Sequence, residues 1–339
     1  MHHLVLSGSP SAIGEIHGET LRADIADCVE IYRDIFKLDD DALSARAMVH
    51  HQAIADAPGS TPYLEEIAGI ARGSGQPEYI IHALNARSEL MADMYPEINE
   101  CTAVYFSQTA LLGQNWDWNS KLESLFVLME IHRPDGHRLM TITEPGMLGK
   151  IGISSAGVGV CLNFMSSPHE LRGLPIHIVL RAVLDAGNFN SAITLARHAG
   201  PGRSGNVMIG SDSGEAITIE YLADERLEFE PEDGTLLHTN HSLGMTPEDE
   251  TLSTSQRYAD SCRWCVEHPE RDLSALQSLL SAKAHPEYPV LREYCKVDGR
   301  MIGTLCTIAM DLPARELHLR IGHDESQQFS CYRLCPDRV

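Results

Sequence analysis

The sequence has few basic residues and no long apolar run. The first shortage argues against binding to nucleic acids or anionic membranes, and the second argues against a membrane-spanning helix. Its 339 residues include 26 Lys and Arg against 48 Asp and Glu, which gives a formal net charge of −22 at pH 7. Nucleic acids and anionic membranes would repel such a chain, so we expect neither as a partner. No segment approaches the ~20 consecutive apolar residues of a membrane-spanning helix. With 43% hydrophobic residues, the chain still has ample material for a core.

The usual signatures of cofactor and metal sites are missing or incomplete. There is no Gly-x-Ser-x-Gly nucleophile motif. Residues 157–159 lack the third glycine of a dinucleotide fingerprint, and residues 146–150 lack the spacing of a phosphate loop. Cys262-Arg-Trp-Cys265 has no second cysteine pair at zinc-ribbon distance, and His238-Thr-Asn-His241 has no third-ligand pattern. We therefore expect neither a metal nor an organic cofactor.

The nine cysteines are an odd number, spread from Cys28 to Cys335. A secreted disulfide framework normally uses an even set in a short chain, so reduced thiols fit this sequence better. The apolar stretch that follows Met1 is too short for a signal peptide. We expect a cytoplasmic protein, in which one of the thiols could be reactive.

The first 100 residues have the periodicity of helices. One apolar stripe repeats at helical spacing, and it consists of Ile25, Val29, Tyr32 and Phe36. Thr61-Pro62 is a typical helix start and Gly73-Ser74-Gly75 a typical stop. A further helix is predicted over Glu78–Met94, ending near Pro96.

Beyond residue 100 the pattern changes to short β-type runs interrupted by two pairs of helices. Strands are predicted at 101–106, 125–132, 138–143, 151–154, 158–163, 206–209, 216–221, 235–239, 304–310, 316–321 and near 329. Helices are predicted at 176–186, 190–198, 255–268 and 273–282. Because hairpins outnumber isolated strands between helices, antiparallel sheets covered by helices are favoured over a doubly wound parallel sheet.

Four segments place reactive side chains beside Gly, Asn and Trp at predicted strand edges: residues 100–103, 113–118, 156–163 and 238–241. Taken singly, each has an ordinary structural explanation. Cys101 suits a buried strand position, Asp117 a turn cap, and Asn240 a loop that satisfies its own backbone.

In this order and spacing, however, the segments resemble the acyl-coenzyme A:6-aminopenicillanic acid acyltransferase family, also called the penicillin acyltransferase-like peptidase family. The most specific part is Gln114-Asn115-Trp116-Asp117 at a fixed distance after Cys101-Thr102. The resemblance covers nearly the whole chain. It includes His17-Gly18, Gly69–Gly75, Leu84–Glu89, Gly113–Trp118, Glu144–Asn163, Gly173–Ala182 and His238–His241.

The resemblance implies an α+β, four-layer αββα fold with antiparallel sheets, that of the N-terminal nucleophile hydrolases. Members cut themselves just before a cysteine, which here is Cys101. A single domain over residues 1–339 would thus become an α chain of residues 1–100 and a catalytic β chain of residues 101–339. The proposed cut falls where the sequence pattern changes. A cysteine thiol has a pKa of about 8.5 and an α-amine one of about 7.7–8.0, so the freed amine can act as the adjacent base.

The resemblance also implies roles for individual residues. Asp117 would lie beside the nucleophile and hold its amine or assist cleavage. The Asn240 side-chain amide and the backbone N–H of Phe164 would hold the oxyanion. Asn163 would contact substrate, although a strand-end hydrogen-bonding role explains this residue equally well.

Two departures from the family pattern stand out. Glu100 occupies the position before the cut, where the family usually has Gly, whose backbone accepts strain more readily. Arg300 is displaced by one residue from the position of a contributing arginine, so no role is carried onto it. His241 is expected beside the site and not as the base, because the α-amine fills that role.

The favoured function is a self-processing amidohydrolase that cleaves a small N-acyl amide through a thioester on Cys101. If an amine resolves the thioester in place of water, the protein is an acyltransferase, with acyl-CoA as a possible donor. A third reading is an uncleaved, inactive precursor or binding module, and Glu100 keeps it open. The partners implied are a small-molecule amide and the α and β chains of one precursor, with a homo-oligomer also compatible.

Overall fold

The computed structural model describes residues 1–91, 101–165, 171–199, 203–223, 225–244 and 252–334. They form two sheets. The eight-stranded sheet has the order β1-β4-β5-β6-β7-β8-β9-β10, and the seven-stranded sheet has β11-β2-β3-β13-β14-β15, with β12 paired to β13.

The strands of the eight-stranded sheet are β1 (His2–Ser7), β4 (Val127–His132), β5 (Arg138–Thr143), β6 (Ile151–Ser154), β7 (Val158–Asn163), β8 (Arg203–Ser211), β9 (Ala216–Ala223) and β10 (Glu225–Phe229). Those of the seven-stranded sheet are β2 (Thr102–Phe106), β3 (Leu111–Asn119), β11 (Thr235–His238), β12 (Cys295–Val297), β13 (Arg300–Asp311), β14 (Glu316–Ile321) and β15 (Ser330–Arg333).

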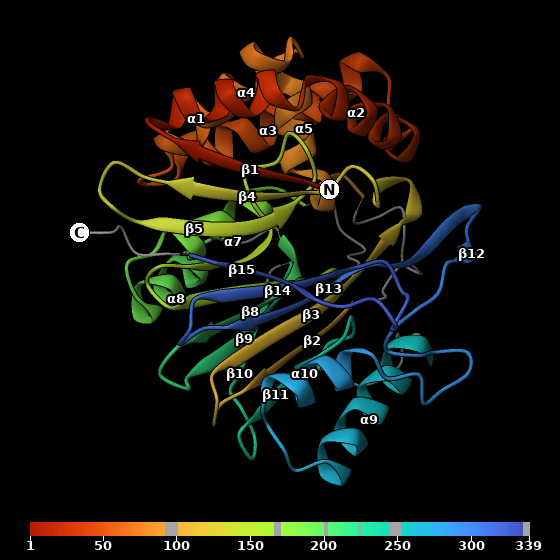
Figure 1. The fold of residues 1–339 in the computed structure, drawn as a ribbon. Coiled ribbons are helices and arrows are strands. Elements are labelled where there is room, and N and C mark those ends of the chain that lie inside the picture. Colours follow the sequence, from red (N-terminus) through yellow and green to blue (C-terminus); the bar gives the residue numbers. More distant parts are fainter. Residues whose placement is uncertain (92–100, 166–170, 200–202, 224, 245–251, 335–339) are drawn as a thin grey trace.

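The two sheets face each other and helices cover their outer faces. α7 (Ile176–Asp185) and α8 (Phe189–Arg197) pack on the eight-stranded sheet, while α9 (Leu252–Glu267) and α10 (Leu273–Leu280) pack on the seven-stranded sheet. β2 and β3 contact β7 across the interface between the sheets. Figure 1 shows the layers, with α9 and α10 below β2 and β3. This layering confirms the α+β, αββα fold predicted from the sequence.

The remaining helices are α1 (Pro10–Thr20), α2 (Arg22–Phe36), α3 (Asp40–Asp56), α4 (Thr61–Ser74), α5 (Glu78–Asn85) and α6 (Arg87–Met91), and a 3₁₀ turn spans Ser120–Leu122. Of these helices, α1 to α5 gather at one side of this sandwich, above β1 and β4 in Figure 1, and α6 contacts α2 and α5. None of the helices among the described residues is long and apolar enough to cross a membrane.

The prediction that the first 100 residues are helical is wrong at the start of the chain. Residues 2–7 form β1, which pairs with β4 in parallel, so the sheets are not purely antiparallel. A parallel pair needs a long crossover connection, which here consists of α1–α6 followed by β2 and β3 of the other sheet. β1 therefore ties the beginning of the chain into a sheet built otherwise from residues beyond 126.

Most other predicted elements are confirmed. β6 and β7 match the predicted ranges, the stripe of α2 is buried, and α4 ends at Gly75, whose φ is 75°. The helix predicted over 78–94 is interrupted at Ala86, between α5 and α6, and its end lies outside the described residues. The short edge elements β10 and β12 were not predicted, because partly exposed polar strands lack a clear alternating pattern.

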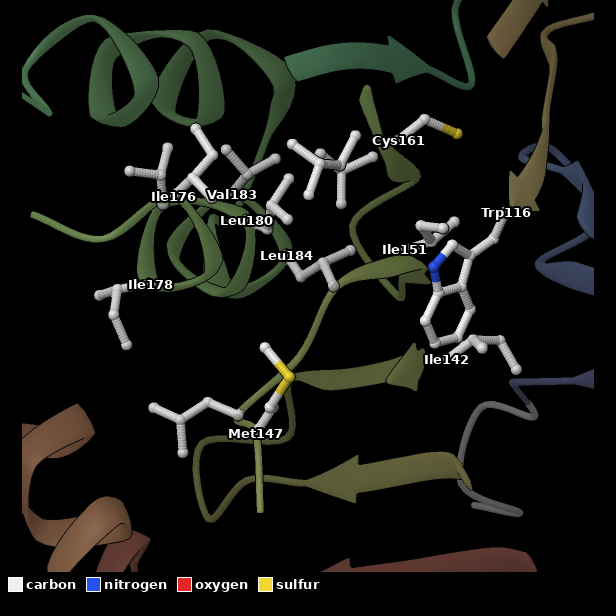
Figure 2. Packing of buried hydrophobic residues seen from close by; sticks show 14 of the residues in the cluster. Trp116, Ile142, Met147, Ile151, Cys161, Ile176, Ile178, Leu180, Val183 and Leu184 are labelled. Carbon is white, nitrogen blue, oxygen red and sulfur yellow. The ribbon is translucent and has the colours of Figure 1, made fainter. Parts of the chain in front are cut away.

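The core between the sheets is apolar and closely filled. Figure 2 shows Trp116 of β3 lying beside Ile142 of β5 and Ile151 of β6. All three are buried, and Trp116 also contacts the ring of Phe126 at a centroid distance of 5.8 Å. The large indole therefore joins the two sheets next to the strand that follows Cys101.

Helices α1 and α4 approach each other through glycines. A Cβ atom on Gly14 would lie 2.0 Å from the Glu66 carbonyl oxygen, and one on Gly69 would lie 2.4 Å from the Ser11 carbonyl oxygen. Gly18 and Gly73, one helical turn further on, meet the same obstruction. Only a residue without Cβ lets the two backbones come this close.

We predict that Gly69→Ala lowers the free energy of unfolding by about 1–3 kcal/mol, because α1 and α4 must separate to admit the methyl group. Urea unfolding followed by circular dichroism measures the change. Gly187→Ala is the matched control, since a Cβ at Gly187 meets nothing within 4 Å. Equal losses in the two variants would contradict the packing argument.

Candidate active site

Cys101 lies at the meeting point of the four segments singled out in the sequence. It directly precedes β2, which is paired on one side with β3, the strand of Asp117, and on the other with β11, which leads into Asn240. Asn163, at the end of β7 in the opposite sheet, donates its side-chain amide to the Cys101 carbonyl oxygen at 3.3 Å. The structure thus brings Cys101, Asp117, Asn163 and Asn240 together.

The Cys101 thiol is almost completely buried. Its Sγ lies 3.8 Å from the backbone carbonyl oxygen of Asp117. Burial and the Asp117 carboxyl raise the pKa of this thiol, while a hydrogen bond with the Asp117 backbone and the charges of Lys150 and Arg257 oppose the rise. In this chain the thiol is therefore a poor nucleophile near neutral pH, since the thiolate is the reactive form.

The Asp117 carboxyl is buried on β3, opposite Thr304 of β13. Burial raises its pKa to about 7, against the opposing effects of Thr304 and Arg257. Neither carboxyl oxygen has a hydrogen bond of normal geometry with another described residue. A positive group arriving beside this carboxyl would find an unused acceptor.

One of the two groups expected to hold an oxyanion, the Asn240 amide, is bonded to the residue that carries the other. The Asn240 side-chain amide donates to the carbonyl oxygen of Phe164 at 2.9 Å. Asn163 also donates to the carbonyl oxygen of His238, at 3.4 Å, and accepts from Asn206 at 3.1 Å. These contacts fix the Asn163 amide beside the backbone of Cys101. They match the strand-end hydrogen-bonding role considered for Asn163 in the sequence.

Arg257 is a site residue that the sequence analysis missed. It lies on α9 and is fully buried. Its Nη1 donates to the Cys101 carbonyl oxygen at 2.8 Å and to the Thr102 hydroxyl at 2.9 Å, and its Nη2 donates to the Asn240 side-chain oxygen at 3.3 Å. Burial lowers the pKa of Arg257 to about 10, so it still carries a charge at neutral pH. Helical arginines are normally solvated, so no sequence signal distinguished this one.

The loop that carries Asn240 is held by a buried carboxylate, Glu220 of β9. Glu220 accepts from Ser242 at 2.6 Å and from the Leu243 backbone N–H at 2.7 Å, and its other contact is His238 at 2.9 Å. Burial acts to raise the pKa of Glu220, but these hydrogen bonds outweigh it and hold the pKa below its usual value. The carboxylate therefore holds the residues before and after Asn240 and so positions its side chain.

Near Cys101 lies a buried charged cluster centred on Glu144. Its carboxylate lies 3.0 Å from Nε of Arg87 and 3.6 Å from Nζ of Lys150, and it accepts a hydrogen bond from the Tyr32 hydroxyl at 2.8 Å. The indole N–H of Trp118 donates to the same Tyr32 oxygen at 3.1 Å. Burial acts to raise the pKa of Glu144, but Arg87 and Lys150 together keep it low.

The turn after Glu144 is held by two side chains of the helical part. Gly146 donates its backbone N–H to Nε2 of His17 at 3.0 Å and its carbonyl oxygen accepts from the Asn85 amide at 3.0 Å. The Asn85 side-chain oxygen in turn accepts from the backbone N–H of Leu148 at 2.9 Å. These contacts explain why His17 and Asn85 stand among the family-like segments.

Lys150 projects from this turn into the interior between the sheets. Its Nζ lies 3.6 Å from the centroid of the Trp116 ring, and no hydrogen bond to another described residue satisfies it. Burial and the nearby Arg87 lower the pKa of Lys150 to about 7, while Glu144 and Cys101 act in the opposite direction. A buried lysine whose pKa is lowered to about 7 was not predicted from the sequence.

Three further residues singled out in the sequence are Glu100, Arg300 and His241. Glu100 lies outside the described residues. Arg300 begins β13, and its Nη1 lies 3.4 Å from the carboxylate of Asp298. His241 lies 3.0 Å from the Thr239 hydroxyl and its ring meets that of Tyr258 edge-on.

The model of the family described as acyl-coenzyme A:6-aminopenicillanic acid acyl-transferase matches residues 106–326, well over half of the chain. A curated relative from Emericella nidulans, the 40 kDa form of acyl-coenzyme A:6-aminopenicillanic-acid-acyltransferase, is 30% identical over 251 residues, covering 72% of this chain and 70% of the relative. The chain belongs to the acyl-coenzyme A:6-aminopenicillanic acid acyltransferase family. The family match includes Asp117, Asn163, Phe164 and Asn240 and begins just after Cys101.

Solved structures share a more distant likeness with this acyltransferase-family chain. A mutant of conjugated bile acid hydrolase from Clostridium perfringens has 12% identity and a TM-score of 0.48, over 69% of this chain and 92% of that chain. Penicillin V acylase from Agrobacterium tumefaciens has 11% identity and a TM-score of 0.44, over 68% and 84% of the two chains.

We predict that Lys150→Met raises the pKa of the Cys101 thiol, because it removes a buried positive charge that stabilises the thiolate. The measurement is the pH dependence of Cys101 alkylation, followed by peptide mass spectrometry. Alkylation of the variant should require a higher pH than alkylation of the wild type. The exposed Lys121→Met serves as the control. An unchanged alkylation profile in Lys150→Met would show that the lysine does not influence the thiol.

Proposed function

We propose that this protein is a self-processing N-terminal-cysteine amidohydrolase that cleaves a small N-acyl amide. The observation that carries the proposal is the set of donors around Cys101. Arg257 and Asn163 both donate to its carbonyl oxygen, Asp117 lies on the neighbouring strand β3, and Asn240 follows the other neighbouring strand, β11. Membership of an acyltransferase family, whose chemistry moves acyl groups, supports an activity on amide carbonyls.

In the proposed reaction, the bond between Glu100 and Cys101 is first cut, which frees the Cys101 α-amine. The amine takes the thiol proton as sulfur attacks the substrate carbonyl. The tetrahedral intermediate collapses to a thioester on Cys101, and the amine product leaves with the proton. Water then attacks the thioester with the α-amine as base, which releases the acid and restores the thiol.

Asp117 suits the role of partner for the new amine. In the uncut chain its carboxyl is buried without a well-formed hydrogen bond, and burial raises its pKa to about 7. An α-ammonium beside it would lower this pKa and hold the carboxylate ionised. The pair would fix the Cys101 backbone in position for attack.

The proposed oxyanion donors must change partners between the uncut and the working enzyme. The Asn240 amide donates to the Phe164 carbonyl oxygen in this chain, and Arg257 holds the Asn240 side-chain oxygen. A substrate oxyanion would replace the Phe164 oxygen as acceptor, with the Phe164 backbone N–H as the second donor. Arg257 keeps the Asn240 amide oriented throughout.

An acyltransferase is the second candidate, favoured by the name of the family and of the Emericella nidulans relative. The steps up to the thioester are the same, and an amine in place of water then takes the acyl group. Product analysis with a panel of N-acyl amides, with and without acyl-CoA donors and acceptor amines, separates the two candidates. Acid release without an acceptor supports the hydrolase, and amide formation that outpaces it supports the transferase.

We predict that purified wild-type protein consists of two fragments, of 100 residues and 339 − 100 = 239 residues. Cys101→Ala should remain one chain, because it lacks the attacking thiol. Intact-mass spectrometry measures both. A wild-type chain that stays uncut after long incubation would refute self-processing and favour a precursor or binding module, the reading suggested by Glu100.

We predict that Asn240→Ala lowers kcat by about 10²–10³ with a much smaller effect on KM, because the lost amide acts on the oxyanion of the transition state. Steady-state kinetics on the cleaved enzyme measures the split. Asn190→Ala, which removes an exposed asparagine side chain on α8 outside the candidate site, is the matched control. A loss of kcat no larger than that of the control would remove Asn240 from the oxyanion site.

A further inference from the structure

Two histidines and a glutamate converge on the helical side of the molecule, outside the candidate active site. His51 belongs to α3, and Glu78 and His82 belong to α5. Because Glu78 and His82 are four residues apart in one helix, their side chains lie on the same face, which is the face toward His51.

The three donor atoms are spaced as ligands of one ion. Nδ1 of His51 lies 2.9 Å from Nε2 of His82, which lies 3.6 Å from Oε1 of Glu78, and the donor atoms of this cluster all fall within 4.8 Å of one another. Zinc binds His nitrogen at about 2.0–2.1 Å in a tetrahedron, which places neighbouring ligand atoms about 3.3 Å apart. The observed separations bracket that value.

The setting also favours an ion over an ordinary surface cluster. His82 is almost fully buried, so its ring is held in place, while the Glu78 side chain is half exposed and leaves a path from solvent. Among described residues, one other His/Cys/Asp/Glu group has such spacing, namely Glu316, His318 and Cys331. There the Glu316 carboxylate is already engaged by Arg333, which makes that group the weaker candidate.

We propose that His51, Glu78 and His82 bind a zinc ion, with one coordination position left to water, and that the ion fastens α3 to α5. Two neutral imidazoles and one carboxylate form a donor set that zinc commonly uses. α5 continues through Ala86 into α6, which begins with Arg87 of the Glu144 cluster. The ion would therefore stabilise the helical part from which Arg87 reaches the interior.

The test uses the full-length protein, reduced and stripped with a chelator, and titrated with Zn²⁺ against a chromophoric competitor. We expect one tight site per chain in the wild type and a rise in melting temperature with zinc, since an ion that binds only the folded state stabilises it. Glu78→Gln and His51→Gln should weaken zinc binding at least about tenfold, because even outer partners of metal ligands contribute about 10–100-fold. Glu316→Gln should bind like the wild type.

Cobalt(II) distinguishes this site from the cysteines. Bound at His51, Glu78 and His82, it should give the intense visible bands of a tetrahedral nitrogen and oxygen site without a thiolate charge-transfer band. The proposal is overturned if no tight site exists, if a thiolate band accompanies the tight site, or if Glu78→Gln and His51→Gln bind zinc as the wild type does. Because the Glu78 side chain is half exposed, Glu78→Gln should retain the fold, and circular dichroism checks this.

Discussion

The charge of one buried carboxylate, Glu144, constrains much of this structure. A carboxylate without access to water stays ionised only when cations neutralise it, and Arg87 and Lys150 do so here. Arg87 comes from the helical first part of the chain, whereas Glu144 and Lys150 follow Cys101 in the sequence. Separating the two parts would remove the Arg87 charge from the buried Glu144 carboxylate, so this ion pair holds the residues before and after 101 together.

The same cluster connects the helical part to the surroundings of Cys101. His17 and Asn85 hold the turn after Glu144, and the turn directs Lys150 onto the ring of Trp116. Trp116 is on β3, whose neighbour β2 begins directly after Cys101. Several segments that resemble the family in sequence are therefore in contact in space, which gives their residue types a physical reason.

On the opposite side of Cys101, the hydrogen-bond donors of the candidate site are bonded to backbone carbonyl oxygens of the same chain. Arg257 and Asn163 hold the Cys101 carbonyl oxygen, and the Asn240 amide is bonded to Phe164. A cut before Cys101 leaves the Cys101 carbonyl oxygen in the chain, so Arg257 and Asn163 keep this backbone in place. The Asn240 amide is the donor that can exchange the Phe164 oxygen for a substrate carbonyl oxygen. This arrangement unites the proposed self-processing and the proposed amide chemistry in one set of residues.

The sequence by itself determined the features that depend on local pattern. These are the stripe of α2, the glycine stop of α4, the hairpin strands β6 and β7, and the order of Cys101, Asp117, Asn163 and Asn240. The tertiary structure alone decided the contacts between distant residues, namely β1 beside β4, Arg257 beneath Cys101, the two cations at Glu144, and His51 facing α5. Helix and strand periodicity reports which face of an element is apolar, but the burial of a charge depends on which partners the fold brings to it.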